Sequence, residues 1–175
     1  SKTIGNEVFV TLSELRDISV IILGAENPGV YTISGGSNIL HAINVAGGIS
    51  ESGSYRKVQI LRKGELVQTI DLYETLIFGK GIFDFDLRSG DTILIEPLGF
   101  LVALSGGVNK SALFEMKSGE TINDLIRFAG GFSQDHDKTQ NISLERDTLN
   151  GSNIIPITLG KTKNMSLLPR DSVIV

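Results

Sequence analysis

A six-residue junction that occurs twice is the feature that most constrains the fold of this 175-residue chain. It reads VAGGIS at 45–50 and FAGGFS at 128–133, and each copy follows an apolar segment and precedes a polar one. A pattern that recurs after about 80 residues indicates two small, similar units rather than one large domain. We therefore expect the tail of a preceding region at 1–16, a first domain at 17–98 and a second domain at 99–175.

Each Ala-Gly-Gly is predicted to end an amphipathic helix. Apolar residues recur at the spacing of one buried helical face in both copies: Ile39, Ile43 and Ala46 in the first, and Ile122, Leu125, Ile126 and Ala129 in the second. Ser37 can cap the first helix, and Thr121 with Asp124 matches a capping box on the second. Gly47 and Gly130 fall where a helix end needs a positive φ. We expect these glycines and the next in each copy to be structural: Gly47, Gly48, Gly130 and Gly131.

The rest of each copy is predicted to form short strands. The pattern predicts hairpins at 18–34 and 100–117, half-buried strands at 56–62 and 141–146, and a tight turn with a β-branched strand at 87–95 and 167–175. Pro28-Gly29 makes the first hairpin turn, so Gly29 is expected to be structural, and Asp71 can cap a short helix ending at Gly79. Each unit thus contains a hairpin, a helix, a strand, a short helix or loop, and a strand. This order predicts an α+β fold with one main helix packed against a small mixed sheet.

The landmarks of the two copies resemble those of the SLBB module, the soluble-ligand-binding β-grasp domain. The first copy carries, in order, Gly24 with Pro28-Gly29, Ala46-Gly47-Gly48, Arg62, Ile70-Asp71-Leu72 and Ser89-Gly90-Asp91. The second keeps Gly106, Ala129-Gly130-Gly131, Arg146 and Asp171, and departs at Lys110-Ser111, Thr158 and Pro169-Arg170. The resemblance covers 17–175 and implies two tandem β-grasp domains.

A tandem of such modules, and the stretch GSYRKVQILRKGELVQTIDLYETLIFGK in particular, resembles the periplasmic part of capsule and exopolysaccharide export proteins of Gram-negative bacteria. The resemblance implies a parent protein attached to the outer membrane, self-assembly into a ring, passage of a polysaccharide, and an inner-membrane polysaccharide co-polymerase as partner. The same module also occurs in cobalamin carriers, a respiratory-complex subunit and DNA-uptake proteins, so the fold alone does not decide the function.

Composition and charge exclude several classes of partner and chemistry. The net charge is −4 and no basic run is present, which argues against nucleic acid as a partner. The chain has no cysteine, which excludes thiol catalysis, disulfides and cysteine-bound zinc. The longest apolar stretches are 18–25, which is too short to span a bilayer, and 93–104, which contains Glu96 and Pro97. We therefore expect no direct membrane insertion by this part of the protein.

Catalytic and metal-binding constellations are not evident, and we expect no catalytic residue, no metal and no cofactor. His41 and His136 have no serine or second histidine at a spacing that indicates nucleophilic catalysis. The adjacent residues Asp135, His136 and Asp137 do not converge on a cation without further ligands. No glycine motif for cradling a phosphate is present.

Two arginines occupy matching places in the copies. Arg62 shares strand parity with the apolar residues before it, and Arg146 does so in the second copy. Because the feature is repeated, we expect structural pairs with Asp91 and Asp171 in preference to ligand contacts.

An exposed aromatic ring beside hydrogen-bonding side chains is the feature expected of a carbohydrate contact. Tyr31 and the cluster Tyr55, Arg56 and Lys57 are the candidates for contact with a glycan or a partner, with a plain surface or oligomer-contact role as the alternative. Only 6% of the residues are aromatic and none is Trp, which favours weak, transient contact.

Two functions remain open at this point. The first is a non-enzymatic periplasmic segment of a polysaccharide export protein, forming part of an oligomeric conduit or docking surface. The second is a binding module for a small ligand or glycan fragment, with a pocket between the two domains. A hydrolase is a distant third, because Asp84 and Asp86 fit a solvated strand face better than a paired-carboxylate site.

Overall fold

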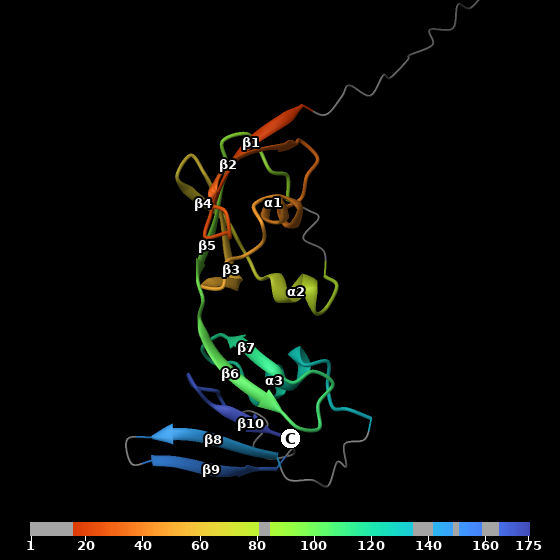
Figure 1. The fold of residues 1–175 in the computed structure, drawn as a ribbon, viewed down its shortest axis with the longest axis vertical. Helices are drawn as coiled ribbons and strands as arrows, with labels where there is room; N and C mark the ends of the chain where they lie inside the picture. Colours follow the sequence, from red (N-terminus) through yellow and green to blue (C-terminus); the bar gives the residue numbers. More distant parts are fainter. Residues whose placement is uncertain (1–15, 81–84, 135–141, 149–150, 159–164) are drawn as a thin grey trace, which may run out of the picture.

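A computed structural model describes residues 16–80, 85–134, 142–148, 151–158 and 165–175, which form two domains in tandem (Figure 1). The first domain contains β1 (Asp17–Leu23), β2 (Gly29–Ser34), α1 (Ile39–Val45), β3 (Gly53–Arg62), β4 (Glu65–Ile70), α2 (Leu72–Leu76) and β5 (Thr92–Pro97). The second contains β6 (Phe100–Ser105), β7 (Ala112–Met116), α3 (Ile122–Phe128), β8 (Ile142–Thr148), β9 (Gly151–Ile157) and β10 (Ser172–Ile174).

Each domain is built on a five-stranded mixed sheet with the same topology. The strand order is β2-β1-β5-β3-β4 in the first sheet and β7-β6-β10-β8-β9 in the second. In both sheets the first and last strands of the domain lie side by side and parallel, and the other pairs are antiparallel. Ile21 is opposite Thr92 in the first sheet, and Ala103 is opposite Ser172 at the matching place in the second. The predicted α+β fold in two tandem domains is confirmed.

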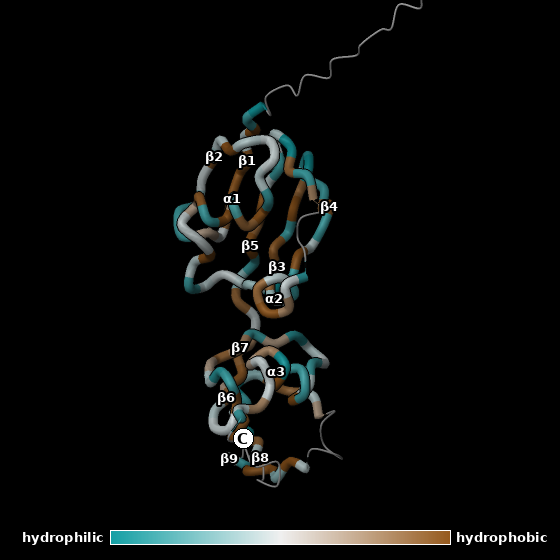
Figure 2. Tube along the Cα trace, turned by 90° about the vertical axis from the view of Figure 1, so that its right-hand side faces the viewer, coloured by the Kyte–Doolittle hydropathy of each residue, from teal (hydrophilic) through white to brown (hydrophobic). Residues whose placement is uncertain are grey.

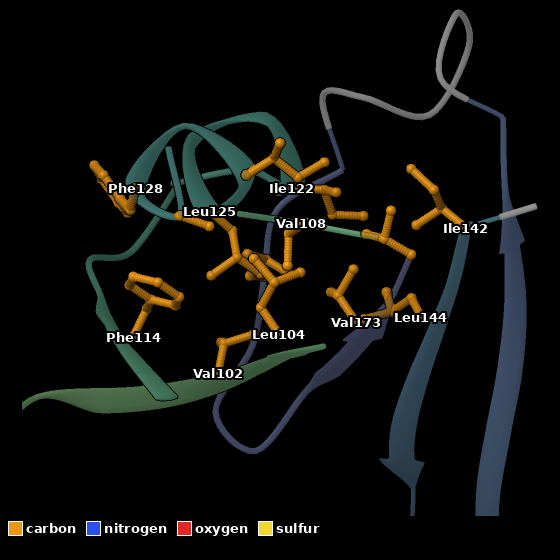
Figure 3. Packing of buried hydrophobic residues seen from close by; sticks show 14 of the residues in the cluster. Val102, Leu104, Val108, Phe114, Ile122, Leu125, Phe128, Ile142, Leu144 and Val173 are labelled. Carbon is orange, nitrogen blue, oxygen red and sulfur yellow. The ribbon is translucent and has the colours of Figure 1, made fainter. Parts of the chain in front are cut away.

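The main helix of each domain covers one face of its sheet and closes a separate hydrophobic core. In the second domain Ile122, Leu125 and Phe128 of α3 are buried in one cluster with Val102 and Phe114 of the sheet (Figure 3). Alternating residues of the strands face this core, so apolar side chains at every second position are buried. Burying one such side chain contributes about 1.5–3 kcal/mol to folding. Figure 2 shows the two domains one above the other, with hydrophobic stretches along the strands and more hydrophilic residues in the connecting loops.

The N-cap predicted for α3 is present, whereas the N-cap of α1 differs from the predicted residue. The Thr121 side chain accepts a hydrogen bond from the main-chain N–H of Asp124, and Asp124 bonds back, so the expected capping box is present on α3. The N-cap of α1 is Asn38, whose side chain accepts from the main-chain N–H of His41, and not the expected Ser37. Asn and Ser cap helices about equally well, so a pattern with both in succession does not decide between them.

The glycines that end the main helices have a positive φ and lie close to an asparagine side chain of a neighbouring loop. Gly47 and Gly130 have φ of +86° and +78°, a region that side chains other than glycine rarely adopt. A Cβ at Gly47 would lie 2.5 Å from the side-chain nitrogen of Asn27. In the second domain the side chain of Asn109 donates to the carbonyl of Gly130 at 2.7 Å. In each domain an asparagine side chain therefore lies close to the glycine that ends the main helix.

Two strands were not expected from the sequence. β4 and β9 form hairpins with β3 and β8, at places where the pattern predicts only a short helix or loop before the final strand. All residues of β4 except Ile70 are exposed, because β4 is an edge strand without a covered face. The alternation that identifies a half-buried strand is therefore missing. The predicted short helix is present after β4 as α2, with Asp71 as its N-cap.

Only residues 98 and 99 separate the last strand of the first domain from the first strand of the second. The connection between the two sheets is therefore very short. Among the residues that the structure describes, no helix combines the length and the hydropathy needed to cross a bilayer.

Candidate functional site

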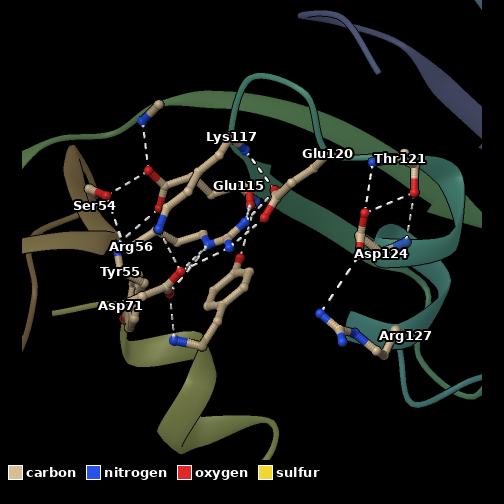
Figure 4. A network of polar contacts seen from close by, with 12 residues as sticks. Ser54, Tyr55, Arg56, Asp71, Glu115, Lys117, Glu120, Thr121, Asp124 and Arg127 are labelled. Carbon is tan, nitrogen blue, oxygen red and sulfur yellow. Dashed lines mark hydrogen bonds and ion pairs between the residues drawn. The ribbon is translucent and has the colours of Figure 1, made fainter. Parts of the chain in front are cut away.

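The two domains meet at a buried polar network that is centred on Arg56 of β3 (Figure 4). Arg56 is only 3% exposed. Its guanidinium binds Asp71 of its own domain at 2.9 Å and Glu120 of the second domain at 2.6 Å, and it donates to the main-chain carbonyl of Glu115 at 3.1 Å. The Nε and both terminal nitrogens each have at least one carboxylate acceptor. A planar guanidinium with paired acceptors thus connects the two domains through one buried side chain.

Two aromatic rings lie against the same guanidinium, one from each domain. The carbon at the centre of the Arg56 guanidinium is 4.8 Å from the ring centroid of Tyr73 and 4.7 Å from that of Phe128. The two rings also meet edge to face, with centroids 5.3 Å apart. Cation–π contact of this kind is strongest where water is excluded, as it is here. The guanidinium is thus held both by its hydrogen bonds and by contact with two aromatic rings.

Glu115 of β7 forms the second centre of the network. Its carboxylate is nearly fully buried and accepts from the Ser54 hydroxyl at 2.6 Å, the main-chain N–H of Tyr55 at 3.0 Å and the main-chain N–H of Gly99 at 2.9 Å. One side chain of the second domain therefore binds the start of β3 and the link between the domains. A buried carboxylate is tolerated only when its oxygens are hydrogen-bonded in this way.

The charges of the network stabilise each other. Lys117 of the second domain binds Asp71 at 2.7 Å, so Asp71 contacts two cations. Burial alone would raise the pKa of Asp71, but the hydrogen bonds from Arg56 and Lys117 outweigh it and hold the pKa below its ordinary value. Burial likewise acts to lower the pKa of Arg56, and its hydrogen bonds to Glu120 and Asp71 raise it above its ordinary value. Both groups are charged at neutral pH.

The surface above this network is hollowed around Tyr55. The ring of Tyr55 is 41% exposed and forms part of the wall of three hollows. One hollow of about 380 Å³ lies between the loops of the first domain and the β6–β7 edge, and includes Glu26, Glu51 and Leu113 in its lining. A second, of about 280 Å³, includes Leu76, Leu113 and Phe128. The junction thus combines a buried polar network with hollows at its surface.

Comparison with known proteins agrees with this architecture. The family model described as the SLBB domain matches residues 25–71 and 101–158. The chain belongs to the SLBB domain family. The two matched segments lie one in each five-stranded sheet, so the repeat seen in the sequence is a tandem of SLBB domains.

Two curated relatives are both the polysialic acid transport protein KpsD of Escherichia coli. Each is 30% identical to this chain over 113 residues, which is 63% of this chain and 20% of the relative. The aligned part therefore spans about a fifth of the length of these relatives.

The tandem SLBB domains separate the residues of the predicted contact cluster. Tyr55 and Lys57 point outward from β3, whereas Arg56 between them points into the junction, because successive residues of a strand face opposite sides. The Arg56 guanidinium is occupied by protein carboxylates and is not part of the surface that a glycan would contact. Lys57 lies 3.9 Å from Glu96. Tyr31 is on β2, packs against the first core and donates its hydroxyl to the carbonyl of Asn27 at 2.6 Å.

Both Arg–Asp pairs expected from the repeat are present in the SLBB domains. Arg62 binds Asp91 at 2.8 Å, and Arg146 binds Asp171 at 2.6 Å. Hydrogen bonding to Asp91 raises the pKa of Arg62 above its ordinary value, and Asp171 does the same for Arg146. Burial acts to raise the pKa of Asp91, but the bonds from Arg62 and from the main-chain N–H of Arg88 lower it.

The other titratable candidates do not form a site in the part of the chain that the structure describes. His41 is exposed on α1, and Asp86 is exposed beside Arg62. Asp84 and the segment at 135–137 lie outside the described residues. Within the described ranges, no group of three or more His, Asp or Glu side chains is close enough to hold a metal ion.

The junction residues from the second domain were not found by sequence reasoning. Glu115 and Glu120 are about 60 positions from Arg56, and no local pattern connects residues so far apart. For Asp71 the sequence predicts only a helix cap and a landmark of the family. The available signal was a difference between the copies, since the first has Asp71 where the second has Thr158.

Proposed function

We propose that this chain is the tandem SLBB segment of a polysaccharide export protein, and that the two domains act as one rigid, non-catalytic unit of an oligomeric conduit. The observation that carries the proposal is the similarity to a polysialic acid transport protein over 113 residues that extend through most of this chain. The tandem of matched SLBB segments supports the same assignment.

The parent protein, in this proposal, is attached to the outer membrane of a Gram-negative bacterium and places these domains in the periplasm. Copies of the parent assemble into a ring, the polysaccharide passes along it, and an inner-membrane co-polymerase delivers the polymer. In this proposal the two domains contribute a fixed shape to the conduit. A conduit needs subunits that keep their shape, and the buried contacts of Arg56 and Glu115 supply a fixed angle between the domains.

A second candidate function is a binding module for a small ligand or glycan fragment. The observation that favours it is the set of hollows around the exposed ring of Tyr55, at the junction between the domains. Pockets at domain junctions are common places for ligands.

The decisive experiment is deletion of residues 17–175 from the parent gene, with surface and periplasmic polysaccharide and the abundance of the protein measured together. Loss of surface polymer from cells that keep a stable, correctly located protein supports export. Unchanged surface polymer overturns the proposal.

The matched substitution is Tyr55→Ala in the intact parent, which removes the ring but leaves the main-chain bond from residue 55 to Glu115. Normal export by this variant supports the conduit. Export that fails although the protein is folded and abundant supports the binding module.

A further inference from the structure

The edge strand β7 is covered by the first domain at one end only. At Glu115 the main-chain N–H donates to the Tyr73 hydroxyl at 3.1 Å, and the main-chain carbonyl accepts from Arg56 at 3.1 Å. Both groups therefore point away from β6, toward the outside of the sheet. The first domain occupies this part of the edge.

Leu113, two residues earlier, directs its main-chain groups to the same side, because hydrogen-bonding direction alternates along an antiparallel strand. Its partner across the sheet is Ala103, which donates its own N–H to Asp171 on the far side at 3.0 Å. Within the described residues, the main-chain N–H and carbonyl of Leu113 have no hydrogen-bond partner. The side chain of Leu113 is 64% exposed. This end of the edge is open for pairing.

The open edge is flanked by hollows on both faces of the sheet. Leu101 and Leu113, which face away from the core, line the larger hollow. Phe114 and Phe128, which face the core, line the smaller one. Tyr55 forms part of the wall of both. A strand added beside β7 would place its side chains alternately into one hollow and then the other.

The charges of the two hollows differ. The larger one has the exposed carboxylates of Glu26 and Glu51 in its lining and no lysine or arginine. The smaller one is apolar apart from Tyr side chains and Lys110. A lysine or arginine side chain suits the first, because its aliphatic stem can lie on Ile49 and Leu98 while its charged end meets the carboxylates. An aliphatic side chain suits the second.

We infer that the open end of β7 is a docking site for an extended segment of a partner protein in which aliphatic and basic residues alternate. Main-chain hydrogen bonds to Leu113 provide the pairing, and the two hollows around Tyr55 select the alternating side chains. The inference goes beyond the proposed export role and does not depend on it: a titration tests the contact, whereas the deletion of 17–175 tests export.

The test is a titration of the isotope-labelled 175-residue chain with a short synthetic peptide of alternating valine and lysine, followed by NMR. We expect shifts at the amides of Ser111, Leu113 and Tyr55, and slower hydrogen exchange at Leu113. A peptide of alternating valine and glutamate is expected to bind about tenfold more weakly or worse. Equal binding of the two peptides, or no shift at Leu113, overturns the inference.

Matched variants separate strand pairing from general surface binding. Leu113→Pro removes the outward N–H without breaking a bond to β6, and is expected to weaken peptide binding about tenfold. Val30→Pro is the control, since Val30 is opposite Ile21 as Leu113 is opposite Ala103, and is 69% exposed on the edge strand β2. It should leave binding unchanged.

Glu51→Gln removes one carboxylate from the larger hollow and leaves β7 unchanged. It should weaken binding of the lysine peptide, and this test remains informative even if the proline variant folds poorly. Peptide binding that survives both Leu113→Pro and Glu51→Gln overturns the inference. Shifts at the same amides with an oligosaccharide, and none with the lysine peptide, assign the surface to a glycan and also overturn it.

Discussion

Both domains carry an arginine on their third strand that binds the aspartate before their last strand, whereas only the first domain carries a second arginine near the start of that strand. The repeated pairs are Arg62 with Asp91 and Arg146 with Asp171, and each stays inside its own domain. The unrepeated residue is Arg56, which binds both domains. In the second copy, Gln140 occupies the position that corresponds to Arg56, and Thr158 occupies the position that corresponds to Asp71. The repeated arginines therefore stabilise each SLBB domain internally, whereas the unrepeated Arg56 connects the two domains.

The largest effect is expected from Arg56→Ala, which leaves the carboxylates of Asp71 and Glu120 without their shared cation and the main-chain carbonyl of Glu115 without its donor. Removing one partner of a buried ion pair costs about 3–5 kcal/mol. Because Arg56 bridges the domains, we expect calorimetry to show two unfolding transitions in place of one, and small-angle scattering to show a wider range of interdomain distances. A single transition with unchanged scattering would contradict the assignment of Arg56 to the junction.

Arg146→Ala is the matched change inside one domain and should have an intermediate effect. The pair is partly exposed on the arginine side, so we expect a loss of about 1–3 kcal/mol confined to the second domain. Arg62→Ala should do the same in the first domain. Residue-resolved hydrogen exchange measures both. Loss of protection across the junction in either variant would show that these pairs are not confined to their domains.

Gly47→Ala and Gly130→Ala compare the same turn in the two domains. Both positions have a positive φ, so each change costs about 1 kcal/mol. The new methyl group would lie 2.5 Å from Asn27 in the first domain and 3.8 Å from Asn109 in the second. We therefore expect Gly47→Ala to destabilise more than Gly130→Ala in urea unfolding. The reverse order would show that the Asn27 side chain moves aside freely.

The smallest effect on stability is expected when the pH is lowered. The folded pKa of Asp71 lies below its unfolded value of about 3.9, so its contribution to stability is complete above that pH and is lost as the pH falls through the folded pKa. Because Asp71 is at the junction, coupling between the domains should weaken in acid. Asp71→Asn should make unfolding less dependent on pH below about 4, as measured by urea titration. An unchanged acid dependence in the variant would contradict this.

Repetition explains which parts of the molecule could be predicted from the sequence. The stripe of Ile122, Leu125 and Ile126 and the cap at Thr121 are local patterns, and local patterns determine helices. The pairs of Arg62 and Arg146 could be expected because each occurs at the same place in its copy. β4 and β9 could not, because nearly all residues of these two edge strands are exposed and they lack the alternation that identifies a strand.

The junction was harder to predict for a different physical reason. Tyr55, Arg56 and Lys57 are adjacent and polar, so the sequence predicts one shared surface for them. A strand places Arg56 on the opposite side, and its burial depends on Glu115 and Glu120 of another domain. The side of a strand that is covered by a neighbouring domain is decided by tertiary contacts and not by the sequence around it.

The parallel pairing of the first and last strands has a mechanical consequence. The chain enters each domain on one of these strands and leaves on the other, and they lie side by side in the middle of the sheet. Tension along the polypeptide therefore acts in shear on all the hydrogen bonds between β1 and β5, or between β6 and β10, at the same time. Hydrogen bonds pulled together in this way resist extension better than bonds that open one after another, so each domain is stiff along the direction in which the chain runs.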